Sequence, residues 1–179
     1  MAKPGAAEPD EELDTHAALI PTKGRALDLA CGLGKNTLFL AKHGLDVDAI
    51  DGSVEALNRL QAFAQACELD EKIRLHQVDL DDYTLPESAY DLVLVVRYLN
   101  RDLLPGIASA LKPGGMLIYK TFNRNILKQR PGFNPAYTIE TRELIDVFSM
   151  LEVITDNRQL ESSEYAFMIA RQPSERHSQ

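Results

Sequence analysis

Short apolar runs alternate along the chain with stretches whose apolar residues recur at helical spacing. The runs predict seven strands, at residues 25–30, 45–51, 73–78, 90–96, 116–122, 151–159 and 163–172. The stretches between them predict a helix that closes at Gly44 and further helices at residues 53–69, 100–111 and 140–149. Repetition of strand, helix and strand indicates a parallel sheet, because right-handed crossovers cover its faces with helices.

The last two predicted strands alternate apolar and polar residues better than the others, as an antiparallel pair does. We therefore expect an α/β fold with a doubly wound, mostly parallel seven-stranded sheet and an antiparallel C-terminal strand pair. Such sheets bind ligands beyond the carboxyl ends of their strands, where the strand order reverses. Pro105 interrupts the predicted helix 100–111, so we expect this helix to restart near Leu104.

The length of 179 residues is that of one domain. We expect a flexible N-terminal segment at residues 1–20, one folded domain at residues 21–171 and a C-terminal tail at residues 172–179. The first residues are small, acidic and proline-containing and lack a signal-peptide pattern, which favours a cytoplasmic location. No apolar run approaches the roughly 20 residues of a membrane span, so no membrane contact is expected.

Charge and cysteine spacing exclude some functions. The net charge of −8 disfavours sequence-independent binding to nucleic-acid phosphates. Cys31 and Cys67 lack the paired spacing of zinc ligands, so we expect two reduced, buried thiols and no metal site.

Gly32 and Gly34 fall where the first predicted strand turns into the first helix. A ligand can approach bare backbone there and meet free N–H groups, although a tight turn without a ligand fits the same pattern. Asp51 ends the second strand, where a carboxylate accepts hydrogen bonds from ribose hydroxyls, or caps the next helix. Dinucleotides and adenosyl compounds compete for such a site, and Thr37 stands where a dinucleotide site has its third glycine.

Five segments together resemble the class I S-adenosylmethionine-dependent methyltransferases, from about residue 25 to residue 170. The segments are "LDLACGLGKNT", "VDAIDGS", "HQVDLDDY", "YDLVLVVRYL" and "LKPGGMLIYKTF". Within that superfamily, "GKNTLFLAKHGLDVDAIDGS" is similar to small bacterial enzymes of the tellurite-resistance type. The chain departs from the pattern in Ala30, where a first glycine is common, and in "VVRYLN", which leaves the acceptor open.

The resemblance implies a Rossmann-like methyltransferase domain at residues 21–171 and S-adenosylmethionine as cofactor. It assigns nine residues to the cofactor: Asp28, Ala30, Gly32, Gly34, Asn36, Asp51, Gly52, Asp79 and Leu80. Among these, Asp28 and the backbone near the glycines would hold the methionine end, Asp51 the ribose and Asp79 with Leu80 the adenine. Asp79 also fits a turn cap.

Arg97 and Tyr98 follow the fourth strand and are predicted to face the methyl group and to position the acceptor. Methyl transfer from a sulfonium requires alignment and exclusion of water more than acid–base groups. The run from Val96 to Leu99 lacks the short acidic or Asn-Pro-Pro-aromatic pattern of nucleobase-amine methyltransferases, which disfavours that class. Arg97 has the wrong charge for a metal ligand, which disfavours the metal-dependent catechol enzymes.

The region from Lys120 to Arg142 holds five basic residues and one acidic residue, and it predicts a substrate loop. Arg124, Arg130 and Tyr137 are its candidate substrate-binding residues. We expect methyl transfer to a small molecule, either an anion or a soft nucleophile such as a thiol or an oxyanion of tellurium or selenium. An ordinary solvated loop, an RNA or protein substrate, and a non-catalytic S-adenosylmethionine-binding module are the alternatives. The oligomeric state is not predicted.

Overall fold

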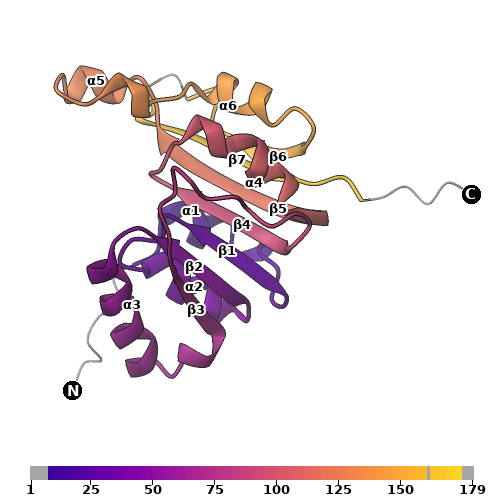
Figure 1. Cartoon of the computed structure of the whole chain (residues 1–179). Coiled ribbons are helices and arrows are strands. Elements are labelled where there is room, and N and C mark those ends of the chain that lie inside the picture. Colours follow the sequence, from indigo (N-terminus) through magenta and orange to yellow (C-terminus); the bar gives the residue numbers. More distant parts are fainter. Residues whose placement is uncertain (1–7, 161, 175–179) are drawn as a thin grey trace, which may run out of the picture. The chain divides into compact units, whose positions relative to one another are not determined.

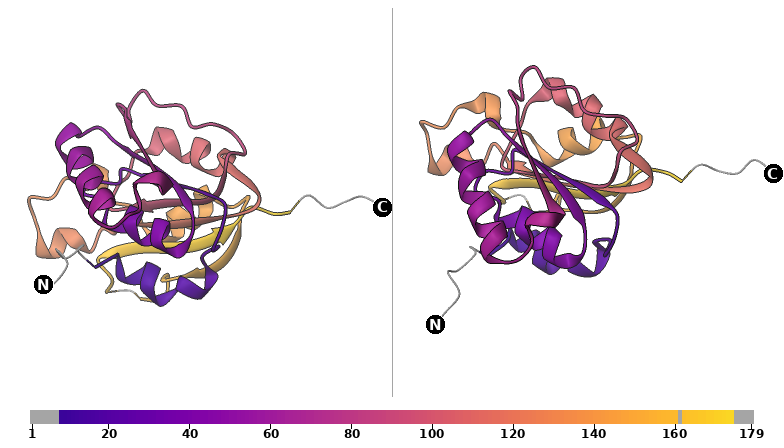
Figure 2. Two further views of the ribbon diagram at one scale, coloured as in Figure 1. Left: turned by 90° about the horizontal axis from the view of Figure 1, so that it is seen from below. Right: turned by 60° about the horizontal axis from the view of Figure 1, so that its bottom comes forward.

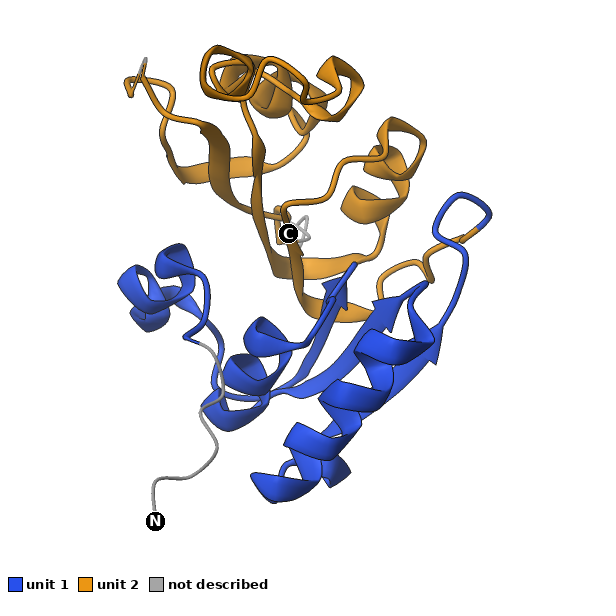
Figure 3. Cartoon of the chain, turned by 90° about the vertical axis from the view of Figure 1, so that its left-hand side faces the viewer, with its two compact units in different colours: residues 1–82 blue, residues 83–179 orange. Residues whose placement is uncertain are grey.

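The strands belong to one seven-stranded mixed sheet in the order β3-β2-β1-β4-β5-β7-β6 (Figure 1). The structure, a computed structural model, describes residues 8–160 and 162–174. Its chain divides into two compact units, unit 1 at residues 1–82 and unit 2 at residues 83–179 (Figure 3). The predicted α/β fold class is confirmed: the sheet is mostly parallel and its last two strands are antiparallel.

Unit 1 contains three parallel strands in the order β3-β2-β1. Its elements are α1 (Glu11–Thr15), η1 (Ala17–Leu19), β1 (Arg25–Leu29), α2 (Lys35–His43), β2 (Asp46–Asp51), α3 (Val54–Ala66), η2 (Asp70–Lys72) and β3 (Ile73–Gln77). Helix α2 packs against β1 and β2, and helix α3 packs against β2 and β3 (Figure 2). The strand–helix alternation predicted for this half of the chain is therefore present.

Local side-chain chemistry fixes the ends of these elements. The Ser53 hydroxyl accepts a hydrogen bond from the Ala56 N–H at 3.2 Å and caps α3. Asp48 is fully buried in β2, and its carboxylate contacts Arg25 of β1 at 2.6 Å and both Arg74 and His76 of β3 at 3.5 and 3.4 Å. This ion-pair network therefore connects all three strands of unit 1.

Unit 2 contains four strands in the order β4-β5-β7-β6. Its elements are β4 (Tyr90–Val96), η3 (Arg101–Leu103), α4 (Leu104–Ser109), β5 (Leu111–Phe122), α5 (Ile126–Gln129), η4 (Pro135–Tyr137), α6 (Thr141–Val147), β6 (Glu152–Asp156) and β7 (Tyr165–Arg171). Strands β4 and β5 are parallel, whereas β7 is antiparallel to both β5 and β6. The helix restart predicted at Leu104 is confirmed, with Pro105 in the first turn of α4.

Strand β5 begins earlier than the sequence predicts. The apolar run predicts a strand that begins at residue 116, but β5 already pairs with β4 at Leu111. The register shifts between Tyr90 and Leu92, and Gly114 has a φ of 78°. A left-handed glycine allows this irregularity within the strand, where residues 112–115 have no partner on β4.

The described part of the predicted N-terminal segment contains the short helices α1 and η1. Asp10 caps α1 by accepting the Glu12 N–H, and Leu13 is fully buried. The boundaries predicted at residues 20 and 172 stay predictions, and residues 1–7 and 175–179 lie outside the described part of the chain. Across the described residues, no helix has the length and apolar character needed to cross a membrane.

Gly44, which ends α2, provides a test of this packing. Its φ is 118°, and an added Cβ would collide with the backbone oxygen of Thr22. We expect Gly44→Ala to lower the free energy of unfolding by about 1–3 kcal/mol, because strain and a backbone clash combine. Urea denaturation monitored by circular dichroism measures this. The control is Gly132→Ala, whose Cβ would meet nothing within 4 Å; equal losses in both variants would contradict the assignment.

Candidate functional site

The glycine turn of unit 1 lies between β1 and α2. Gly34 donates its N–H to the Cys31 carbonyl at 3.0 Å, which closes the turn, and Gly32 and Gly34 have φ values of 56° and 77°. A Cβ on Gly34 would overlap the side chain of Leu60 on α3, whereas a Cβ on Gly32 would meet nothing within 4 Å. Gly34 is thus required by helix packing, and Gly32 leaves open space beside the backbone.

The Asp51 carboxylate connects this turn to the next one. Its Oδ2 accepts the Gly32 N–H at 2.8 Å, and its Oδ1 accepts the Ser53 N–H at 2.8 Å. Each carboxylate oxygen has a second lone pair, so the half-buried carboxylate retains acceptor capacity. Gly52 follows it, and a Cβ there would lie 3.5 Å from the Val78 carbonyl.

Asp28 lies near the end of β1 with an exposure of 2%. The Thr37 hydroxyl donates to its Oδ2 at 2.6 Å. Burial raises the pKa of Asp28 to about 7, the charge of Asp51 adds to the rise, and the Thr37 hydrogen bond opposes it. Burial likewise raises the pKa of the nearby Cys31 thiol, so this cysteine is protonated and unreactive near neutral pH.

Ala30 and Asn36 hold the ends of the same turn. Ala30 adopts a left-handed φ of 58°, which explains why a glycine suits this position. Asn36 is buried at the start of α2, and its Oδ1 accepts the Asp10 N–H at 2.8 Å. That hydrogen bond positions the start of α1 beside the glycine turn.

The residues after β3 form a local turn. The Asp79 Oδ1 accepts the Asp81 N–H at 3.0 Å, so the capping alternative for this exposed side chain is present. Leu80 is buried at 9% exposure, and Val78 donates its N–H to the Asp51 carbonyl at 3.2 Å. The ends of β2 and β3 therefore lie together, while the adenine-binding role of Asp79 and Leu80 stays a prediction.

Arg97 and Tyr98 lie after β4 in unit 2. Arg97 has a φ of 59°, and its guanidinium Cζ lies 5.6 Å from the centroid of the Tyr165 ring. Tyr98 is half-buried, and its carbonyl accepts the Tyr119 hydroxyl at 3.1 Å. Their predicted positioning role is not tested by these contacts.

The predicted basic loop is only partly a loop. Lys120 belongs to β5 and is 2% exposed, because its side chain packs toward the Tyr165 ring. The Arg124 Nε lies 3.8 Å from Glu140, and Arg130 and Tyr137 are exposed. Within the described residues, no contact joins Arg124, Arg130 and Tyr137.

Several residues that shape the site carry no obvious sequence signal. Arg101 donates to the carbonyls of Ala136 and Thr138 at 3.0 Å and fixes the segment that carries Tyr137. Tyr165, which contacts Arg97, lies far from it in the sequence. Thr37 is an exception, because it stands where the dinucleotide pattern has its third glycine. The structure shows that its hydroxyl donates to Asp28.

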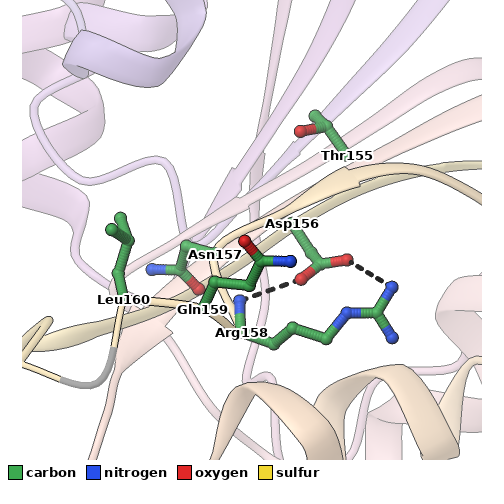
Figure 4. A pocket seen from close by; sticks show the side chains of 6 residues that line it. All are labelled: Thr155, Asp156, Asn157, Arg158, Gln159 and Leu160. Atoms are coloured by element: carbon green, nitrogen blue, oxygen red, sulfur yellow. Dashed lines mark hydrogen bonds and ion pairs between the residues drawn. The ribbon is translucent and has the colours of Figure 1, made fainter.

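Two surface pockets of unit 2 contain none of the predicted site residues. One, of about 410 Å³, is lined by residues 155–160, and within it Arg158 pairs with Asp156 at 3.2 Å (Figure 4). The other, of about 260 Å³, is lined by Arg142, Ile145, Asp146 and Arg158. Arg158 lines both pockets and is paired with Asp156. Neither pocket contributes a residue to the candidate site.

Comparison with known proteins gives a family match. The methyltransferase domain family matches residues 26–115, just over half of the chain. A putative methyltransferase, YqeM of Bacillus subtilis, is 31% identical over 138 residues, which cover 66% of this chain and 55% of that protein. A ubiquinone biosynthesis O-methyltransferase of Coxiella burnetii is 30% identical over 112 residues, which cover 59% and 47%. The chain spans about half the length of these curated relatives.

The fold is shared with solved structures. TehB from Haemophilus influenzae superimposes with a TM-score of 0.72 at 20% identity, over 88% of this chain and 60% of that chain. The predicted resemblance to methyltransferases, including the tellurite-resistance type, is confirmed at the level of fold. The assignments of individual site residues stay predictions.

The buried Asp28 carboxyl predicts how stability depends on pH. Its pKa is raised from an unfolded value near 4 to about 7, so the folded state binds more protons at this group, and the contribution of Asp28 to stability is lost as pH rises from about 4 to about 7. Asp28→Asn removes this titration but keeps an acceptor for Thr37. We expect the variant to gain stability relative to the original protein between about pH 5 and pH 8.

Denaturation at a series of pH values measures this difference. The control is Asp82→Asn, which removes an equal charge from an exposed position of unit 1. A stability difference for Asp28→Asn that stays constant with pH would show that Asp28 does not titrate in this range.

Proposed function

Because the chain belongs to the methyltransferase domain family, we propose that it transfers a methyl group from S-adenosylmethionine to a small molecule. The observation that carries this proposal is the Asp51 carboxylate, which accepts N–H groups from the glycine turn and from the start of α3. A ribose presents two adjacent hydroxyl donors. A carboxylate already fixed by two backbone donors binds them without further ordering.

The residues of unit 1 fit the cofactor. Open space beside Gly32 admits a ligand to the backbone, and the half-buried Asp51 keeps lone pairs for hydroxyl groups. Asp79 and Leu80, which follow β3, would bind the adenine through a carboxylate and an apolar wall. When bound, S-adenosylmethionine supplies an electrophilic methyl group on a sulfonium.

Asp28 binds the amino group of the cofactor in this proposal. A carboxylate forms a charge-assisted hydrogen bond with an ammonium group, but a protonated Asp28 does not. Because burial raises the pKa of Asp28 to about 7, only part of the Asp28 carboxyl is ionised near neutral pH. A cation beside it lowers this pKa, so binding releases a proton.

It follows that cofactor affinity depends on pH. We expect the affinity for S-adenosylhomocysteine to increase as pH rises from about 6 to about 8 and then to level off. Isothermal titration calorimetry in two buffers of different ionisation enthalpy measures both the affinity and the released proton. The Asp28→Asn variant serves as control and should lose both the pH dependence and the proton release; if it retains them, another group is responsible.

Unit 2 binds the methyl acceptor in this proposal. Arg97 and Tyr98 position it, and Arg124, Arg130 and Tyr137 supply charge and an apolar wall. The relative from Coxiella burnetii, named as an O-methyltransferase of ubiquinone biosynthesis, supports a small acceptor. The net charge of −8 also favours a small molecule over RNA.

Removing the Asp51 charge tests the cofactor site. Asp51→Asn leaves one oxygen for two backbone N–H donors, so we expect S-adenosylhomocysteine to bind at least about tenfold more weakly. Calorimetry measures the affinity, and circular dichroism checks that the variant is folded. Asp82→Asn is the matched control; unchanged affinity in Asp51→Asn would refute the proposed ribose contact.

The acceptor class is tested with labelled methyl groups. The protein is incubated with methyl-labelled S-adenosylmethionine and a cell extract, and the products are separated into small-molecule and macromolecular fractions. We expect label among the small molecules and its loss with Asp51→Asn. Label only in RNA or protein would contradict the acceptor class, and no label despite tight cofactor binding would indicate a non-catalytic binding module.

A further inference from the structure

Arg97 presents an exposed guanidinium that lies over an aromatic ring. Its Cζ is 5.6 Å from the centroid of Tyr165, and its backbone N–H donates to the Lys120 carbonyl at 2.7 Å. Among the residues that the structure describes, no carboxylate pairs with this guanidinium. A guanidinium over a ring still exposes N–H donors at its edge, so Arg97 retains donors for an anion.

The backbone of Arg97 supports a functional role. Its φ of 59° lies in the left-handed region, which residues other than glycine rarely adopt. Residues in this conformation concentrate at binding and catalytic sites, where the surrounding structure holds them in place.

Aromatic side chains extend the same surface. Lys120 and Phe122 are two residues apart on β5 and therefore lie on one face, and Phe122 pairs in register with Tyr165 of β7. The Phe122 and Tyr165 rings stack with centroids 5.3 Å apart, and Phe133 meets Phe122 edge-on at 4.8 Å. These three rings are each half-buried, so part of their surface is accessible.

The position of this cluster in unit 2 suits a ligand. Strand β4 ends at Val96, directly before Arg97, and its parallel neighbour β5 ends at Phe122. Ligands of parallel sheets bind beyond the carboxyl ends of the strands. The Lys120 Nζ lies 4.9 Å from the centroid of the same Tyr165 ring.

We propose that Arg97 and Tyr165, together with Phe122 and Phe133, bind the carboxylate and the ring of an aromatic acid. The inference rests on the proposed function, because it names the chemical class of the methyl acceptor. A guanidinium pairs with a carboxylate through two parallel hydrogen bonds, and aromatic rings pack on one another at the distances seen in this cluster.

Benzoate and benzamide are suitable probes, because they share shape and ring but differ in charge. Ligand-observed NMR titrations of the full chain give both dissociation constants. We expect benzoate to bind about tenfold more tightly than benzamide, since a charge-assisted pair is lost in the amide. Equal binding of the two probes would overturn the proposal.

Two variants locate the preference. Arg97→Gly suits a φ of 59° and removes the guanidinium, so we expect benzoate to bind no better than benzamide. Tyr165→Leu removes the ring and should weaken both probes several-fold. The control Arg59→Met removes one charge from an exposed ion pair on α3 and should leave both affinities unchanged.

Other outcomes separate this inference from the proposed function. If Arg130→Met loses the benzoate preference and Arg97→Gly keeps it, the carboxylate is bound by the predicted loop and the proposal for Arg97 is refuted. S-adenosylhomocysteine affinity is measured on the same samples. Tight S-adenosylhomocysteine binding without benzoate preference would refute the aromatic-acid site alone, whereas benzoate preference without S-adenosylhomocysteine binding would support the anion site and refute the methyltransferase proposal.

Discussion

The turns that follow β1 and β2 in unit 1 depend on two hydrogen bonds to the carboxylate of Asp51. Its two oxygens accept the N–H groups of Gly32 and Ser53, each at 2.8 Å. One turn leads from β1 into α2, and the other leads from β2 into α3, so a single side chain fixes two strand-to-helix connections. Each carboxylate oxygen accepts one of these two N–H groups and retains a second lone pair for a ligand.

Two buried acidic residues of unit 1 differ in their partners. Asp48 and Asp28 are both buried, but Asp48 contacts Arg25 and Arg74, whereas Asp28 accepts hydrogen bonds from the neutral residue Thr37. A buried carboxylate without a cation is expensive, which is why burial and the nearby Asp51 charge raise the pKa of Asp28 to about 7. Asp48 thus joins strands, while Asp28 is poised to respond to a cation that binds beside it.

Much of this could be predicted from periodicity and motif spacing. Strands β1, β2 and β4 fall where apolar runs predict them, and the Ser53 cap and the restart at Leu104 follow from local chemistry. Local chemistry did not predict the early start of β5, because Leu111 pairs with Tyr90 of β4 before an irregular segment, residues 112–115, in which Gly114 is left-handed. Nor did it predict the burial of Lys120, which depends on which face of β5 the side chain occupies.

The aromatic cluster shows why the acceptor side of a site is harder to predict than the cofactor side. The residues proposed to bind the cofactor lie within a few positions of strand ends, so spacing along the chain identifies them. Arg97 and Tyr165 are 68 positions apart and meet only because β5 pairs with β4 on one side and with antiparallel β7 on the other. Antiparallel pairing brings the start of β7 to the end of β5, so residues contributed by both strands share the edge at which parallel sheets bind ligands. The chemistry of that edge is therefore set by long-range register, which no local pattern contains.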